Sequence, residues 1–357
     1  MKSRKIYILA ICFLLSALSF FIHSKAGNNT TAKTCRPNVL FIILDAARAD
    51  HFSCYGYKRK TTPYIDKIGS QGAVFLNHFS NDTETAYSLP KIFFSRYITL
   101  PAIQEDRWIW GIKQESPETI GKKFDNQQIS LIKALSLCGY KTSIFTTEDA
   151  GDVLSKENYL IKDFESFNLS PDDKNLIFAV GSWLKENKEN RFFAYCHIMC
   201  PHMPYPPENE IKEFFDKKDS AAVAKIRDKM KRGINDDGSA WPEQDIRILQ
   251  GLYDSNLRHS DVLVRLIYDK LKELELENKT MLIITADHGE NIGEHNYFQH
   301  GGTPWDSVIK VPLIMVYPPL VPMGARVNGM TEAVDIMPTL IDACNIRLPR
   351  GKLMDGK

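Results

Sequence analysis

The strongest constraint on the fold is an unbroken apolar run over residues 39–44 that stops at Asp45. Such a run, bounded by polar residues, is typical of a strand buried on both faces of a parallel sheet. The pattern recurs at residues 192–196, before His197, and at residues 281–286, before Asp287 and His288. The sequence therefore predicts several buried strands that each end at a polar side chain.

Helical patterns separate these strands. Residues 129–138 are amphipathic and stop at Gly139, a helix terminator. Acidic residues at 172–173 are typical of the start of a helix, which we expect to reach about residue 188, and helical spacing continues over 242–274. A further strand is expected over 311–316. Strands that alternate with helices predict an α/β fold with a wrapped parallel or mixed sheet.

Ligand sites of open α/β sheets lie beyond the carboxyl ends of the strands. Asp45, His197 and the Asp287-His288 pair all fall at such ends. A lone acid after a strand is usually a helix cap or a solvated loop residue, but three such strand ends favour a site. Adjacent Asp and His combine oxygen and nitrogen ligands, which suits zinc or manganese better than calcium.

The N-terminus has the pattern of an export signal. Basic residues at positions 2, 4 and 5 precede an uncharged, mostly apolar run over 6–22. We expect residues 1–26 to be a signal peptide or a single membrane anchor, 27–36 a linker, and 37–357 the catalytic domain. The protein is then exported, to the periplasm or the cell surface. A net charge of +1 without a basic stripe argues against nucleic-acid binding.

Several short motifs follow one another in order along the chain. They are 44–51 (LDAARADH), 55–57 (YGY), 62–63 (TP), 85–90 (TAYSLP), 287–290 (DHGE), 300–301 (HG), 310–313 (KVPL) and 335–340 (DIMPTL). With them the chain resembles the sulfatase-like branch of the alkaline phosphatase superfamily over about residues 37–342. The resemblance implies a three-layer α/β/α sandwich around a central mixed, mostly parallel sheet. Sulfatase-like proteins often continue into a smaller C-terminal subdomain, which we expect to be short or absent in residues 37–357.

The nucleophile region departs from formylglycine sulfatases, which carry Cys or Ser before x-Pro-x-Arg and a second aspartate after the first. Here Ser88-Leu89-Pro90-Lys91 is followed by Ile92, and Asp45 is followed by Ala46. The segment 85–90 instead resembles the nucleophile segment of bacterial phosphoethanolamine transferases. That resemblance implies Thr85 as the nucleophile, with Ser88, converted to formylglycine, as the alternative.

The resemblance also implies a metal site. Asp45, Thr85, Asp287 and His288 are the expected ligands of a divalent ion, zinc before manganese or calcium. Such an ion would stabilise the alkoxide of Thr85, which is otherwise a weak nucleophile. A segment with the spacing His-x4-His-x-Pro begins at His197. His202 and His300 match positions that bind a second metal or the substrate phosphate, and His197 is either a proton donor or structural.

Three functions remain open from the sequence. The first is a metal-dependent phosphotransferase of the phosphoethanolamine type, with a phospholipid or other ester donor, a glycan or lipid acceptor and an association with the membrane. The cysteines that usually flank its nucleophile loop are missing. The second is a sulfatase or phosphodiesterase that uses water as acceptor. The third is a non-catalytic surface protein that kept the fold.

Overall fold

A computed structural model describes most of the chain after its N-terminus. The described residues are 36–97, 108–109, 112–113, 128–154, 160–205, 214, 220–231, 241–348 and 354–357. The expected signal or anchor, and the linker apart from Arg36, lie outside them. Pro37–Lys357 forms one compact unit. Among the helices that the structure describes, none is long and apolar enough to cross a membrane.

An eight-stranded sheet forms the centre of this unit, in the order β12-β2-β11-β8-β1-β7-β5-β6. Only the pairings of β11 with its two neighbours are antiparallel, so the predicted mixed, mostly parallel sheet is confirmed. The strands are β1 (Asn38–Leu44), β2 (Ala73–Phe79), β5 (Lys141–Thr147), β6 (Ser166–Ser170), β7 (Phe192–Ile198), β8 (Thr280–Thr285), β11 (Leu313–Val316) and β12 (Ala325–Glu332).

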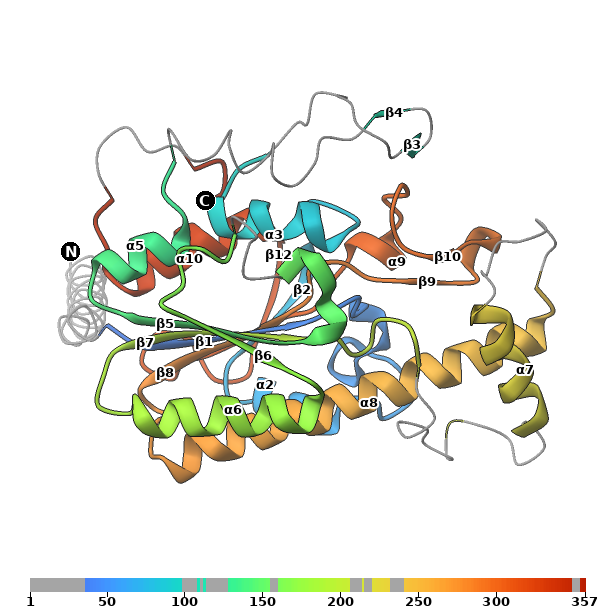
Figure 1. The fold of residues 1–357 in the computed structure, drawn as a ribbon, viewed down its shortest axis with the longest axis horizontal. Helices are drawn as coiled ribbons and strands as arrows, with labels where there is room; N and C mark the ends of the chain where they lie inside the picture. Colours follow the sequence, from blue (N-terminus) through green and yellow to red (C-terminus); the bar gives the residue numbers. More distant parts are fainter. Residues whose placement is uncertain are drawn as a thin grey trace, which may run out of the picture. The chain divides into compact units, whose positions relative to one another are not determined.

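Helices cover both faces of the sheet, as Figure 1 shows. On one face lie α2 (Pro63–Gly69), α6 (Asp173–Glu186) and α8 (Glu243–Glu273); on the other lie α3 (Thr85–Phe94), α5 (Leu131–Leu137) and α10 (Ile336–Ala343). Alternate residues of β1 enter two separate cores: Leu40 packs toward α6 and α8, and Phe41 toward α3 and α10. Two helical layers on one sheet confirm the predicted α/β/α sandwich.

The register brings the ends of three strands together. Ile43 of β1 pairs with His197 of β7 on one side and with Thr285 of β8 on the other. Because these strands are parallel, the residues that follow β1 and β8 meet at one edge of the sheet. The predicted stop before His197 is wrong: β7 continues through Ile198, so the His197 side chain projects from within a strand.

The expected helices are confirmed with small changes in their bounds. The Asp172 side chain caps α6 by accepting a hydrogen bond from the amide of Asn175. Helix α8 runs for 31 residues without a break. It crosses the lower face of the sheet in Figure 1 and reaches the same edge as the strand ends.

Candidate active site

Asp45, Asp287 and His288 meet where β1 and β8 end. His288 Nε2 lies 3.6 Å from Asp45 Oδ1 and 3.6 Å from Asp287 Oδ2. All three residues are buried, with at most 2% of their surface exposed. Two carboxylates and an imidazole in this space form a group that could hold one metal ion.

Thr85 is the first residue of α3, and it faces the same group. Its Oγ1 lies 3.2 Å from His288 Nε2. The amino end of a helix carries unpaired N–H groups and a partial positive charge, which favour an anion. The hydroxyl therefore lies where both the buried ligands and the end of α3 would attract an anionic ester.

The remaining polar atoms of the group fit a cation. Among the described residues, neither Asp45 Oδ1 nor Asp287 Oδ2 has a hydrogen-bond partner, although both are buried. His288 donates from Nδ1 to the carbonyl of Gly289 at 2.9 Å, which leaves the lone pair of Nε2 directed at the carboxylates. Unpaired buried carboxylate oxygens are costly unless something binds them, and these oxygen and nitrogen donors suit zinc or manganese.

The other carboxylate oxygens are held by the protein. Asp287 Oδ1 accepts hydrogen bonds from the amides of His288, at 3.0 Å, and Ala46, at 3.4 Å. Asp45 Oδ2 pairs with His197 Nε2 at 3.0 Å. Burial alone would raise the pKa of Asp45, but the charge of His202 and the hydrogen bond to His197 hold it well below its usual range.

His197 lies behind Asp45 and away from solvent. Its second ring nitrogen pairs with the Tyr195 hydroxyl at 2.8 Å, and the residue is 0% exposed. Burial opposes charge on the ring, yet the hydrogen bond to Asp45 raises the pKa of His197. With both nitrogens engaged, His197 is arranged to orient Asp45 rather than to reach a leaving group.

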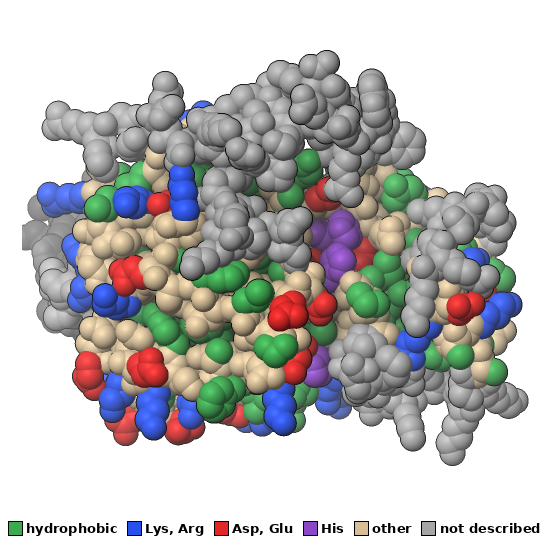
Figure 2. Space-filling view, viewed as in Figure 1, with side chains coloured by type: hydrophobic (Ala, Val, Ile, Leu, Met, Phe, Trp, Pro, Cys, Tyr) green, Lys and Arg blue, Asp and Glu red, His purple; other side chains and the backbone are tan. Residues whose placement is uncertain are grey.

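His202 and His300 extend the site toward the surface. The His300 ring stacks on His288 at 4.2 Å between centroids, and the His202 ring lies 5.0 Å from His300. Figure 2 shows histidine side chains gathered in one place on this face, with acidic side chains beside them. The structure thus brings both histidines next to the Asp45–Asp287–His288 group.

Glu290 supports His300 and was not predicted as a site residue. Its Oε1 pairs with His300 Nδ1 at 3.0 Å, and the carboxylate is 1% exposed. Burial alone would lower the pKa of His300, but the charge of Glu290 and this hydrogen bond raise it to about 9. The only signal for Glu290 in the sequence was its place in the Asp-His-Gly-Glu segment.

Ser88 occupies a different environment from Thr85. It is 0% exposed and donates a hydrogen bond to the backbone carbonyl of Asp287 at 2.6 Å. Its Oγ also lies 3.0 Å from the Ser80 hydroxyl, which donates to the same carbonyl. Ser88 therefore fastens α3 to the residues after β8 through the backbone of Asp287, not through its carboxylate.

The loop after β1 is fixed by contacts from distant parts of the chain. Arg48 forms ion pairs with Asp50 at 2.9 Å and with Glu294 at 2.6 Å. The Tyr253 hydroxyl of α8 donates to the carbonyl of Ala46 at 2.9 Å and accepts from the amide of Arg48 at 2.8 Å. These contacts hold the backbone of Ala46 at a φ of 61°, a conformation that residues other than glycine rarely adopt.

A glycine turn connects His300 to the segment before the nucleophile. The amide of Gly301 donates to the carbonyl of Thr83 at 3.1 Å. Gly301 has a φ of +88°, and a Cβ atom there would lie 2.8 Å from Glu84 Oε1. Glycine adopts this φ without strain, and the turn places His300 beside the start of α3.

With this geometry described, comparison with known proteins identifies the family. The Sulfatase family model matches residues 37–346 of this chain. The chain belongs to the sulfatase family. This confirms the predicted membership of the alkaline phosphatase superfamily. The residues matched nearly coincide with those over which the sequence resemblance extends.

Relatives of this sulfatase-family chain are distant. An arylsulfatase of Hemicentrotus pulcherrimus is 22% identical over 93% of the chain and 62% of its own length. An arylsulfatase of Clostridium perfringens is 20% identical over 88% of the chain and 76% of its own length. The chain thus spans less than two thirds of the first of these relatives.

Solved structures show the same fold. The phosphonate monoester hydrolase of Agrobacterium radiobacter matches with a TM-score of 0.62 at 18% identity, over 89% of this chain and 79% of that one. The C-terminal periplasmic domain of phosphoethanolamine transferase EptC from Campylobacter jejuni matches with a TM-score of 0.61 at 20% identity, over 88% and 90%. At these identities the likeness establishes the fold alone.

Proposed function

We propose that this chain hydrolyses phosphate or sulfate esters through a covalent ester on Thr85. The observation that carries the proposal is the convergence of Thr85 Oγ1 on His288 Nε2, beside two buried and unpaired carboxylate oxygens. Membership of the sulfatase family supports the reaction class.

Asp45, Asp287, His288 and Thr85 would hold a divalent cation, which lowers the pKa of a bound hydroxyl and offsets negative charge on an ester. Thr85 Oγ1 gives up its proton to water and attacks phosphorus or sulfur; its bond to that atom forms, the bond to the ester's alkoxy oxygen breaks, and the departing alkoxide takes a proton from water and leaves as the alcohol. His300 is charged at neutral pH and can donate to an oxygen of the transferred group. Water then attacks the Thr85 ester, and phosphate or sulfate leaves.

Thr85 fits the nucleophile's role better than Ser88 does. Attack requires a hydroxyl that a substrate can reach, and Ser88 is 0% exposed with its proton directed at the carbonyl of Asp287. Formylglycine sulfatases carry Cys or Ser at the reacting position, whereas this position in our proposal is a threonine, Thr85. The proposed covalent ester is therefore on an unmodified threonine.

A transferase is the second candidate. The curated relatives favour hydrolysis over the transfer that the sequence put first, whereas the Thr85-Ala86-Tyr87-Ser88 segment and the likeness to the EptC domain favour transfer. In that case the donor would be a phospholipid or another ester, and the acceptor a glycan or lipid. Export and anchoring by residues 1–26 would place either enzyme at a periplasmic or surface location.

One assay separates these functions. Zinc-loaded or manganese-loaded protein is incubated with an aryl phosphate and an aryl sulfate in ¹⁸O-labelled water, with and without a lipid or glycan acceptor. Hydrolysis predicts label in the released anion without any acceptor. Turnover only with an acceptor supports the transferase, and full turnover after chelation contradicts the metal-dependent mechanism. No turnover under any of these conditions supports a non-catalytic protein.

A further inference from the structure

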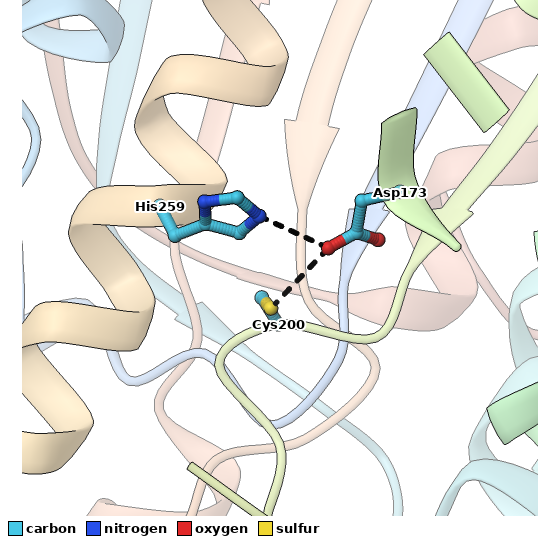
Figure 3. Close-up of side chains that lie close together, drawn as sticks. All are labelled: Asp173, Cys200 and His259. Carbon is cyan, nitrogen blue, oxygen red and sulfur yellow. Dashed lines mark hydrogen bonds and ion pairs between the residues drawn. The ribbon is translucent and has the colours of Figure 1, made fainter. Parts of the chain in front are cut away.

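A second cluster of side chains lies outside the site described above. Asp173 is the first residue of α6, Cys200 follows β7, and His259 projects from the middle of α8. Figure 3 shows the Cys200 thiol and the His259 ring both directed at the Asp173 carboxylate. His259 Nε2 lies 3.1 Å from Asp173 Oδ2, and Cys200 Sγ lies 3.8 Å from the same oxygen.

These separations are close to those between ligands of one ion. Zinc binds sulfur at about 2.3 Å and nitrogen or oxygen at about 2.0–2.2 Å, so the ligand atoms of a tetrahedral site lie roughly 3.3–3.8 Å apart. The three donor atoms of this cluster all lie within 4.8 Å of one another.

The surroundings leave room for a further ligand. The three residues line a cavity of about 520 Å³ that His202 also lines. Cys200 is buried, while the side chains of Asp173 and His259 are 23% and 30% exposed. The Cys200 side chain, a soft sulfur donor, is in no disulfide, and its Sγ also lies 3.7 Å from Asn256 Oδ1. Three protein ligands beside open space are typical of sites that keep one position exchangeable.

We infer that Asp173, Cys200 and His259 form a binding site for a thiophilic divalent ion of the zinc class. Its ligands are one thiolate, one imidazole and one carboxylate, and binding releases the thiol proton. The site is separate from the Asp45–Asp287–His288 group, which offers no sulfur. Because Cys200 and His202 belong to the same short loop, the bound ion fixes the loop that carries His202 against α6 and α8.

Cobalt substitution tests this inference, because cobalt bound to a thiolate has a near-ultraviolet charge-transfer band that oxygen and nitrogen ligands do not produce. We expect this band in the cobalt-loaded wild-type chain. C200S and H259A should lose the band and bind one cobalt ion fewer per chain. C138S, which alters a partly buried cysteine after α5 on the other face of the sheet, is the matched control and should keep both.

The Asp287→Asn variant separates this inference from the proposed function. It should lose one ion from the first site and keep the thiolate band. Circular dichroism of each variant establishes that it is folded, and H259Q provides a second, milder change at the same ligand. A wild-type spectrum without the band, or a band that survives in C200S, overturns the inference and leaves His259 and Asp173 as an ordinary ion pair.

Discussion

The two hydroxyls in the first turn of α3 differ in what surrounds them. Thr85 faces His288 and carboxylate oxygens that have no partner among the described residues. Ser88 donates to the backbone carbonyl of Asp287 and lies beside the Ser80 hydroxyl. The Thr85 hydroxyl is therefore arranged to bind something, and the Ser88 hydroxyl is arranged to hold the helix in place.

This difference shows that one short helix carries both the proposed nucleophile, Thr85, and a residue that anchors the helix, Ser88. Polar groups inside a protein are normally satisfied, and exceptions concentrate at functional sites. Ser88 fixes α3 to the residue that also supplies a carboxylate, because it bonds the carbonyl of Asp287. The position of Thr85 thus depends on a buried contact one helical turn away.

We expect the largest effect on turnover from Asp287→Asn, which removes the negative charge of one proposed metal ligand beside Thr85. The amide oxygen can still accept from the backbone, so the fold should be kept, but turnover should fall roughly thousandfold or more. Metal content, measured by mass spectrometry, should fall by one ion per chain. Asp342→Asn, at an exposed position of α10, is the control. Unchanged turnover in Asp287→Asn contradicts the proposed metal site.

Removing the nucleophile should have an effect of similar or slightly smaller size. We expect Thr85→Ala to lose roughly a thousandfold in kcat while binding the metal less tightly. Thr85→Ser keeps a hydroxyl at the same position and should retain measurable turnover. The comparison of the two variants in one steady-state assay separates chemistry from packing. Wild-type activity in Thr85→Ala would contradict the assignment of Thr85 as the nucleophile.

Substitution of Ser88 should change the stability of the fold rather than the reaction at Thr85. Ser88→Ala removes a buried hydrogen bond, and we expect it to lower the free energy of unfolding by about 1–3 kcal/mol. Urea unfolding of the metal-free protein measures this change. The variant should still form the ester on Thr85. A complete loss of turnover in a folded Ser88→Ala protein argues that Ser88 takes part in the reaction.

The smallest effect concerns His300, whose pKa Glu290 raises to about 9. Its charge, and its attraction for an anion, should be present at neutral pH and be lost as the pH rises through about 9. The ion pair of His300 with Glu290 contributes fully to the free energy of unfolding below about pH 6.5. This contribution is lost as the pH rises through about 9. Inhibition by inorganic phosphate should weaken up to about tenfold between about pH 8 and pH 10.

His300→Gln tests that pH dependence directly. The variant should bind phosphate more weakly at pH 8 and show little further change up to pH 10. Phosphate remains a dianion over this range, so the change reports on the protein. A wild-type inhibition constant that stays flat up to pH 10 contradicts a charged His300 at the site.

The sequence predicts the central strands well, for a physical reason. A strand covered on both faces must be mostly apolar, as β1, β7 and β8 are. The ends of β1 and β8 are visible where a polar residue follows, whereas β7 continues through the polar His197. The outer strands were not predicted. In β12, at the edge of the sheet, most residues are exposed or half-buried, and polar and apolar side chains are mixed. The site residues at the ends of β1 and β8 followed from the same logic.

Other parts of the site depend on contacts that no local pattern contains. The sequence left Thr85 and Ser88 as competing nucleophiles, because only the packing of α3 on β8 shows which hydroxyl is buried. The pairing of Glu290 with His300 requires the turn between β9 (Asn291–Ile292) and β10 (Phe298–Gln299). The cluster around Cys200 joins three distant segments, so its spacing along the chain carries no signal.

The most direct test of the difference between Thr85 and Ser88 is to locate the covalent ester. Metal-loaded wild-type protein is mixed with an aryl phosphate, quenched with acid within the first turnover, digested, and analysed by fragmentation mass spectrometry. We expect one phosphorylated residue, Thr85, in the peptide that contains both hydroxyls, with Ser88 unmodified. A phosphate on Ser88, or formylglycine at position 88 in active protein, would contradict it.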